Sequence, residues 1–217
     1  LAPFGREGIY TESAFRFEGD RLMATEDWFG YLDDPAEDYA AFQNRFQHYA
    51  DIAGWAQRQV EDAVLEVVRR RMSTHPSDQL CYTGGVALNA VANGKILESG
   101  IVRRLYLEPA AGDNGIAIGC ALYGHLTVKK QPRTFVMRSP FLGRTYDQFD
   151  EAEAFRPFSV RVTTRRRKLT DDIVSTAAER LADGKVLGWF QGAAEFGPRA
   201  LGNRSILADP RDPAVKD

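Results

Sequence analysis

The most regular hydrophobic pattern of the chain is helical and starts near residue 51. From there to Ser73, apolar residues recur at three- and four-residue spacings, while charged and amide residues fall on the other faces. This pattern predicts one long amphipathic helix, which ends before His75-Pro76 because proline disfavours helical backbone in the preceding residue. Residues 1–50 instead combine turn signals with clustered aromatics, which predicts short strands or packed loops.

Residues 79–128 have the pattern of an α/β unit. The apolar run 80–83 predicts a short buried strand that leads directly into Gly84-Gly85. The alanine-rich segment 86–98 predicts a helix rather than a hairpin at Asn93-Gly94, because alanine favours helices and disfavours strands. The rest of the unit is predicted as a helix end at Gly100, a strand over 102–107, a loop over 109–113 and a helix over 116–126.

A second unit follows residues 129–145, which have no clear periodicity and are predicted to form a linker. Alternation of apolar and polar residues over 158–162 predicts a strand. Thr170 is predicted to cap a helix that carries acidic residues in its first turn and ends at Gly184. The apolar run 185–191 predicts a further strand.

Composition and charge exclude several classes of protein. The 217 residues are 44% hydrophobic and 27% charged, as in an ordinary globular protein. The formal net charge of −2 gives no global electrostatic case for nucleic acid. The basic run 165–168 is interpreted as a solvated stretch before a helix, with a local nucleic-acid patch as the alternative. No apolar run approaches the roughly 20 residues of a membrane span, and we expect no secretory signal. Cys81 and Cys120 are too few for a disulfide framework, so we expect a cytoplasmic location.

The stretch 195–207 is the most informative segment for chemistry. Arg199 and Arg204 lie among glycines, and arginine presents a planar fork that fits phosphate or carboxylate oxygens. Glycine lets backbone N–H groups approach a ligand closely. The stretch therefore predicts a loop that binds a compact oxyanion, with Asn203 and Ser205 as further polar contacts. The alternative is a glycine-proline turn whose two arginines are solvated.

A second candidate site lies where the strand 80–83 meets the predicted helix. Gly84-Gly85 at this junction places backbone N–H groups at a helix N-terminus, an arrangement that binds phosphate. Asn89 is predicted one turn into the helix, within reach of a ribose or phosphate oxygen. The spacing matches neither a Walker loop nor a Rossmann fingerprint. A tight strand-to-helix turn without a ligand is the alternative.

Asp113 is a third candidate. It lies in a glycine-flanked loop between a strand and a helix, from which its carboxylate could ligate a hard cation. Its alternative role is the N-cap of a helix that starts at Asn114, and the two roles are compatible. The histidines are isolated in the sequence and are expected to be surface or packing residues rather than metal ligands; they are His48, His75 and His125.

Together, these motifs resemble the NodU/CmcH-type O-carbamoyltransferases. The similarity follows the family's order from the first residues to the last, and the final motif is long and specific. The segments that carry it are Leu1-Ala-Pro-Phe-Gly5, Gly84-Gly-Val-Ala-Leu-Asn89, Pro109-Ala-Ala-Gly-Asp-Asn-Gly115, Gly188-Trp-Phe-Gln-Gly192 and Glu195-Phe-Gly-Pro-Arg-Ala-Leu-Gly-Asn-Arg-Ser-Ile-Leu-Ala-Asp-Pro-Arg211.

The resemblance implies an α/β enzyme in two parts. Residues 1–130 would be the C-terminal portion of a Kae1-like domain of the actin/hexokinase/Hsp70 type, which binds nucleotide and a metal. Residues 131–145 would be a linker, and residues 146–217 the N-terminal portion of an α+β YrdC-like domain that takes up carbamoyl phosphate. The implied reaction forms a carbamoyl-adenylate from carbamoyl phosphate and ATP. The carbamoyl group then passes to a hydroxyl of a small molecule, such as a sugar, an antibiotic or a nodulation factor.

The resemblance also assigns roles to individual residues. It implies that the metal is Fe²⁺ and that its second and third ligands lie outside this chain. It implies that the two arginines bind carbamoyl phosphate and take part in catalysis. The full assignment is Gly84, Gly85, Asn89 and Gly112 to nucleotide, Asp113 to metal, and Arg199, Asn203, Arg204 and Ser205 to carbamoyl phosphate.

The sequence also departs from the family pattern. The family's paired metal histidines lie in a His-x-x-x-His motif that this sequence lacks, and family members are much longer. We therefore expect an internal fragment that does not catalyse the full reaction alone and that self-associates, for example as a homodimer, through apolar surface at its edges. Two other classes stay open: a Kae1- or HypF-like carbamoylation factor acting on tRNA or protein, and a non-catalytic module that binds nucleotide or an anion.

Overall fold

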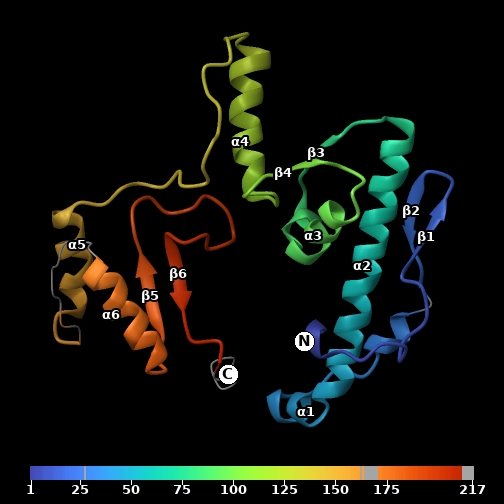
Figure 1. Ribbon diagram of the computed structural model, residues 1–217, viewed down its shortest axis with the longest axis horizontal. Coiled ribbons are helices and arrows are strands. Elements are labelled where there is room, and N and C mark those ends of the chain that lie inside the picture. Colours follow the sequence, from blue (N-terminus) through green and yellow to red (C-terminus); the bar gives the residue numbers. More distant parts are fainter. Residues whose placement is uncertain (27, 162, 164–170, 212–217) are drawn as a thin grey trace. The chain divides into compact units, whose positions relative to one another are not determined.

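The computed structural model describes residues 1–26, 28–161, 163 and 171–211. The chain divides into two compact units, residues 1–107 and 108–217. The first unit combines helices with two two-stranded sheets and the second with one, which confirms the predicted mixed α/β class (Figure 1). The Kae1-like and YrdC-like assignments, and the domain boundaries drawn from them, stay predictions. Among the described residues, no helix is both long and apolar enough to cross a membrane.

The first unit is built on the long helix α2 (Phe46–Thr74), which confirms the predicted helix but begins before residue 51. The extension is made by aromatic contacts, because the Phe46 ring packs edge-on against Phe4 at 5.7 Å and Phe42 at 6.1 Å. Such tertiary contacts leave no helical period in the sequence. The elements before α2 are η1 (Ala2–Phe4), the antiparallel strands β1 (Phe15–Glu18) and β2 (Arg21–Ala24), η2 (Phe29–Leu32) and α1 (Tyr39–Asn44).

The N-terminal segment packs against α2 at a close backbone crossing. A Cβ atom on Gly5 would lie only 2.4 Å from the Ala50 carbonyl oxygen, so this position requires glycine. Beside the crossing, the buried Asp51 carboxylate accepts hydrogen bonds from the Arg6 backbone N–H at 2.7 Å and from its guanidinium at 2.6 Å. These bonds from Arg6, together with one from Gln47, hold the pKa of Asp51 well below its usual range. The first motif of the chain is therefore a packing motif.

The predicted β-α-β unit is confirmed. Strands β3 (Gln79–Tyr82) and β4 (Arg104–Leu107) pair in parallel, and α3 (Ala90–Glu98) connects them. Gly100 has a φ of +68° just after α3, as expected at a helix C-terminus. The buried core joins α2 to this unit through Val68, Ile96 and Val102.

Two details of this unit differ from the prediction. The strand β3 is not fully buried, because Leu80 and Tyr82 are half-buried while the residues between and before them are exposed. The predicted helix over 86–98 is divided into a 3₁₀ turn, η3 (Gly85–Leu88), and α3, because Asn89 is extended and caps α3. An asparagine competes well for the N-cap position, so it starts a helix rather than continuing one.

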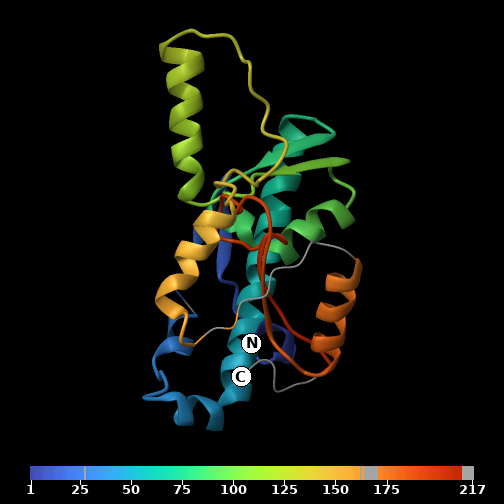
Figure 2. The same cartoon turned by 90° about the vertical axis from the view of Figure 1, so that its left-hand side faces the viewer.

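The second unit contains α4 (Asn114–Tyr123), which continues without a break into the π-helical turn η4 (Gly124–Val128) (Figure 2). Residues 130–147 have no helix or strand, in the region predicted as a linker. The remaining elements are α5 (Gln148–Phe155), η5 (Arg156–Phe158), α6 (Asp171–Ala182) and the antiparallel strands β5 (Leu187–Phe190) and β6 (Arg204–Leu207).

The helix and strand predicted before the last motif are confirmed as α6 and β5. After α6, Gly184 has a φ of +74°, and the Lys185 N–H donates to the Arg180 carbonyl, which closes the helix end. Thr170, predicted to cap this helix, and the basic run 165–168 lie outside the described residues.

The strand predicted over 158–162 is wrong. Pro157 lies in the 3₁₀ turn η5, and residues 159–161 continue as turns. Phe158 is 51% exposed and Val160 is 99% exposed, so these two apolar positions face no core. Alternation predicts a strand only where another layer can cover its apolar face. Residue 162 lies outside the described residues.

Candidate functional site

The loop of residues 191–203, which joins β5 to β6, closes around the carboxylate of Glu195. Oε1 of this buried side chain accepts hydrogen bonds from the backbone N–H groups of Leu201 at 2.7 Å and Asn203 at 2.8 Å. The Asn203 amide donates in turn to the Ala193 carbonyl at 2.9 Å. The N–H of Gln191 donates to the Asn203 carbonyl at 3.0 Å, which continues the β5–β6 ladder into the loop. The segment is therefore an internally braced loop rather than a simple turn.

Arg204 is the first residue of β6, so the predicted loop ends one residue earlier than its second arginine. The pattern did not reveal a strand here, because the short run of residues 204–207 becomes a strand only by pairing with β5. The Arg204 guanidinium turns back over the loop, where Nη2 donates to the Gly197 carbonyl at 3.0 Å and Nε lies 3.6 Å from Glu195 Oε2. Its side chain nevertheless remains 47% exposed.

The other predicted anion-binding residues occupy different parts of the same hairpin. Arg199 is exposed on the loop. In the sequence it lies between Glu195 and Leu201, whose backbone N–H donates to Glu195. Asn203 is half-buried and uses its amide within the loop. Ser205 is half-buried in β6, opposite Trp189 of β5. Arg199 and part of Arg204 thus face solvent, while Asn203 serves the loop itself.

The loop of residues 191–203, with Arg204 at its end, is called the arginine loop below. It packs against residues 108–113, which include the predicted metal ligand Asp113, although about 85 residues separate the two segments in sequence. A Cβ on Gly197, whose φ is +139°, would lie 2.7 Å from the Pro109 carbonyl oxygen and 3.4 Å from the Ala110 Cα. Ala110 is fully buried, and a Cβ on Gly115 would lie 2.3 Å from its carbonyl oxygen. Gly197 therefore allows the loop 191–203 to approach the loop 108–113 closely, and Gly115 allows the first turn of α4 to lie against Ala110.

A third segment fixes the loop from another side. The Phe196 N–H donates to the Pro140 carbonyl at 2.7 Å, and the Gly143 N–H donates to the Ala194 carbonyl at 3.0 Å. A Cβ on Gly143 would lie 2.9 Å from the Ala194 backbone, so this contact also depends on glycine. Residues 140–143 belong to the predicted linker and serve to anchor the arginine loop.

Asp113 lies in the loop that touches Gly197, next to the start of α4. The helix begins at Asn114 as predicted, but the Asp113 side chain makes no capping hydrogen bond and the residue has helical backbone. Gly112 is half-buried and Asp113 is exposed. In the described part of the chain, no three His, Cys, Asp or Glu side chains gather closely enough to hold a metal ion. Asp113 thus presents a carboxylate at the surface, without companion ligands among these residues.

The predicted phosphate loop lies in the other unit. Gly84 has a φ of +104°, and both Gly84 and Gly85 are exposed, with open space where a Cβ would point. This exposed backbone leaves room for a ligand to approach the start of η3. Asn89 does not lie one turn into a helix as predicted: it is the N-cap of α3, and its Oδ1 accepts from the Ala92 N–H at 3.1 Å. Capping fixes its position and occupies its oxygen.

Comparison with known proteins identifies the family. The family described as "Carbamoyltransferase N-terminus" matches residues 7–122, and "Carbamoyltransferase C-terminus" matches residues 178–217. The first match covers more than half of the chain. The chain belongs to the carbamoyltransferase family. The resemblance inferred from the motifs is thereby confirmed.

Curated relatives of this chain span far more sequence than it does. Nodulation protein NolO of Bradyrhizobium diazoefficiens is 41% identical over 175 residues, which are 79% of this chain and 31% of that protein. The 3'-hydroxymethylcephem-O-carbamoyltransferase of Amycolatopsis lactamdurans is 32% identical over 156 residues, 72% of this chain and 27% of that protein. The Streptomyces clavuligerus protein of the same name is 31% identical, with 72% and 27% covered. The chain therefore spans less than a third of these relatives.

Both carbamoyltransferase matches reach the second unit. The N-terminal match ends within α4, so it includes Asp113 and its loop, and the C-terminal match contains the arginine loop. The contact between Gly197 and residues 109–110 thus joins segments from the two family regions. The glycine pair at 84–85 also lies within the N-terminal match, but in the first unit.

A polar network that includes Asn89 was missed in the sequence. Gln57 and Asn89 exchange two amide hydrogen bonds of 3.0 Å each, and Gln57 also donates to Glu61 at 2.6 Å. Glu61 is buried and forms an ion pair with Lys95 of α3. The signal was present, since Gln57 and Glu61 are four residues apart on the predicted helix and so lie on one face. This network ties the residue after η3 to α2.

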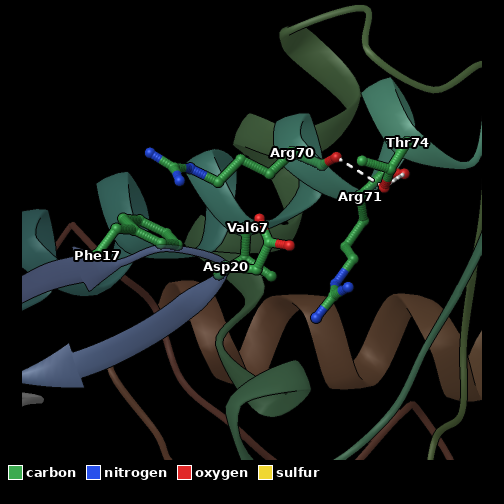
Figure 3. Close-up of a pocket in the computed structure, with 6 residues that line it drawn as sticks. All are labelled: Phe17, Asp20, Val67, Arg70, Arg71 and Thr74. Carbon is green, nitrogen blue, oxygen red and sulfur yellow. Dashed lines mark hydrogen bonds between the residues drawn. The ribbon is translucent and has the colours of Figure 1, made fainter.

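A small hollow elsewhere in the first unit has a structural explanation. It lies between the β1–β2 hairpin and the end of α2, and Figure 3 shows its lining residues. The Arg70 guanidinium lies 3.9 Å from the centre of the Phe17 ring and donates to the Gly19 carbonyl at 3.1 Å. Arg70 thus fastens the hairpin to the helix. The residues around the hollow are Phe17, Asp20, Val67, Arg70, Arg71 and Thr74.

Proposed function

We propose that the chain is part of an O-carbamoyltransferase that moves a carbamoyl group from carbamoyl phosphate to a hydroxyl of a small molecule. The proposed intermediate is a carbamoyl-adenylate made with ATP. Family membership supports carbamoyl transfer in general, and the relatives named as cephem O-carbamoyltransferases support a hydroxyl acceptor. The acceptor is proposed to be of the sugar, antibiotic or nodulation-factor type, and the relatives' names support the last two, since one names a cephem and another nodulation.

The observation that carries the proposal is the arginine loop and its contact with the Asp113 loop. Carbamoyl phosphate is a small dianion, and guanidinium groups bind phosphate oxygens with charge-assisted hydrogen bonds. Arg199 is exposed on the loop, and Arg204 keeps 47% of its side chain exposed. Both arginines are proposed to bind carbamoyl phosphate, and their positive charge would stabilise the phosphate as it leaves. Asn203 and Ser205 have supporting positions within the same hairpin.

The nucleotide is proposed to bind at the exposed glycine pair of the first unit. Gly84 and Gly85 leave open space beside the backbone, which suits close approach of a phosphate group. Asn89 would contribute indirectly, because its amide is committed to the α3 cap and to Gln57. Gly112 lies in the second unit, and its assignment to nucleotide stays a prediction from the family resemblance.

The metal of the family fits the described residues poorly. Asp113 offers one carboxylate, and no group of three ligating side chains forms in the part of the chain that the structure describes. One carboxylate alone does not make a site for Fe²⁺, which takes several ligands. The roles proposed for the arginines and for the glycine pair therefore do not depend on a metal. Asp113 as a single ligand, completed by residues outside this chain, stays a proposal.

Binding of carbamoyl phosphate to the 217-residue chain, measured by calorimetry, tests the proposal. Because the chain spans less than a third of its relatives, binding is a sharper readout than turnover. Arg199→Ala should weaken binding roughly 10- to 100-fold, since one charge-assisted hydrogen bond is lost. Arg180→Ala, which removes an equal charge from exposed α6, is the matched control and should bind like wild type. Equal affinities for the two variants would rule the loop out as the binding site.

A further inference from the structure

Glu195 determines the course of the arginine loop. Its side chain has no exposed surface, and one carboxylate oxygen accepts the N–H groups of both Leu201 and Asn203. Between these two residues, Gly202 has a φ of +112°, which allows the backbone to turn around the carboxylate. The loop therefore reaches Arg204 along a path that Glu195 fixes.

The second carboxylate oxygen faces Arg204. Glu195 Oε2 is buried and has no hydrogen-bond partner among the described residues, and Arg204 Nε lies 3.6 Å away. This separation is too long for a good hydrogen bond, but opposite charges at this distance still attract each other, although solvent at the exposed part of Arg204 weakens the attraction. At its other end the guanidinium donates to the Gly197 carbonyl at 3.0 Å. Arg204 is thus held at two points while nearly half of its side chain faces solvent.

The carboxylate is charged at neutral pH. Burial raises the pKa of Glu195, but hydrogen bonds from the backbone N–H groups of Asn203, Glu195 and Leu201 more than offset this, so the pKa lies below its usual range. A full negative charge therefore lies beside the guanidinium that the proposed function assigns to an anion. By charge alone, Glu195 would weaken anion binding at this loop. A functional benefit has to come from geometry.

We propose that Glu195 is a positioning residue for carbamoyl phosphate. Its carboxylate holds the 201–203 backbone and the Arg204 guanidinium where they receive the phosphate group of the ligand. This inference rests on the proposed function and adds to it a residue that makes no contact with the ligand. A purely electrostatic role predicts the opposite effect on affinity. Removing the charge would then tighten anion binding, because the loop would gain one net positive charge.

The test compares Glu195→Gln with wild type by calorimetry, using carbamoyl phosphate and inorganic phosphate as separate ligands. Glutamine keeps the shape of the side chain but places an NH₂ group or a neutral oxygen against Arg204. We expect about tenfold weaker binding of both ligands. Glu179→Gln, on the exposed surface of α6, is the matched control and should not change either affinity. Unchanged or tighter binding by Glu195→Gln would overturn the inference.

A double-mutant cycle shows whether the effect passes through Arg204. If Glu195 acts by positioning this side chain, Glu195→Gln should have little further effect in an Arg204→Gln background. A full tenfold loss in that background would overturn the role assigned to Arg204. If Glu195→Gln does not fold, Glu195→Asp keeps the charge but shortens the reach of the carboxylate. It should bind several-fold more weakly than wild type, and wild-type affinity in this variant would contradict the inference.

A measurement without ligand separates this inference from the proposed function. Amide hydrogen exchange at Leu201 and Asn203 should become faster in Glu195→Gln than in wild type, because the carboxylate no longer accepts both N–H groups as an anion. Unchanged exchange would overturn the positioning role even if carbamoyl phosphate binds. Conversely, faster exchange in the variant together with a wild-type chain that binds neither ligand would overturn the proposed function and leave the structural role of Glu195 established.

Discussion

Three buried carboxylates each hold a basic side chain that is itself partly exposed. The exposed fractions of the acid and base side chains are 2% and 62% for Asp51 and Arg6, and 4% and 43% for Glu61 and Lys95. For Glu195 and Arg204 they are 0% and 47%. A buried charge is tolerated only when it is paired and accepts further hydrogen bonds. In all three pairs the acid is the fixed partner, so it determines where the basic group lies.

The Asp51 pair makes the stability of the chain depend on pH. Hydrogen bonds from Arg6 hold the pKa of Asp51 well below its value in an unfolded chain, which is about 3.9. The resulting stabilisation is fully present above that value and is lost as the pH falls toward the folded-state pKa. Urea denaturation of wild type should therefore show a falling free energy of unfolding between about pH 5 and pH 3.

Asp51→Asn provides the comparison for this prediction. The variant should be less stable than wild type at pH 7, with a melting temperature several degrees lower, and should lose less further stability on acidification. Asp62→Asn changes an exposed carboxylate of the same helix and should follow the wild-type curve. Parallel pH curves for wild type and Asp51→Asn would contradict the assignment.

At the scale of elements, glycine determines which segments can lie together. Gly5 admits the N-terminal segment to α2, and Gly197 and Gly115 enclose the peptide at Ala110. These contacts are between backbones, so no side chain of the partner segment signals them in the sequence. Gly197 is the most informative case, because it combines a φ of +139° with a close neighbour.

Gly197→Ala should separate the arginine loop from residues 109–110. The added Cβ would lie 2.7 Å from the Pro109 carbonyl oxygen, on a backbone that disfavours any side chain. Gly202→Ala has a similar strain, with a φ of +112°, but its Cβ meets open space. Each variant should lose about 1–3 kcal/mol of stability from strain, and Gly197→Ala should lose more and also bind carbamoyl phosphate more weakly. Equal losses in chemical denaturation would show that the contact contributes nothing.

The elements that the sequence predicted correctly have strong local signals. The strand, the alanine-rich segment and the second strand that form β3, α3 and β4 each carry their own pattern, and a parallel pair needs such a crossover. The strand predicted over 158–162 lacked a covering layer, which a local pattern cannot reveal. Strand β6 and the early start of α2 depend on partners distant in sequence.

The candidate site was predicted in its residue types and missed in its organisation. The arginines and glycines of 195–207 indicated an anion loop, but the role of Glu195 depends on N–H groups six and eight residues further along. Backbone donors have no sequence signature, so their acceptor could not be recognised. Asn89 was placed inside a helix because the alanines around it favour helix, although asparagine itself favours the N-cap position that it occupies.

At the scale of the whole molecule, the candidate residues divide between the two units. The glycine pair and Asn89 lie in the first, while Gly112, Asp113 and the arginine loop lie in the second. Within the second unit, segments from both carbamoyltransferase family regions are in contact. If ATP binds at the glycine pair and carbamoyl phosphate at the arginine loop, a change in the glycine pair should affect only ATP binding, and a change of Arg199 should affect only carbamoyl phosphate binding.

Gly85→Ala tests this division with a change that the fold tolerates. A Cβ at this position meets no atom within 4 Å and the φ is not in the left-handed region, so the melting temperature should remain close to that of wild type. A ligand close to the backbone would meet the new methyl group, so ATP should bind about tenfold more weakly. Gly94→Ala, which also has open space beside it but lies inside α3, is the control and should not change ATP binding.

Titrating each variant with the other ligand decides whether ATP and carbamoyl phosphate have separate sites. Gly85→Ala should bind carbamoyl phosphate as wild type does, and Arg199→Ala should bind ATP as wild type does, when each ligand is titrated alone. In the double variant, each affinity should fall by the factor seen in the matching single variant, because independent sites have additive free energies. Loss of both ligands on changing Arg199 alone would mean that ATP also binds at the arginine loop, and the glycine pair would then be a strand-to-helix turn without a ligand.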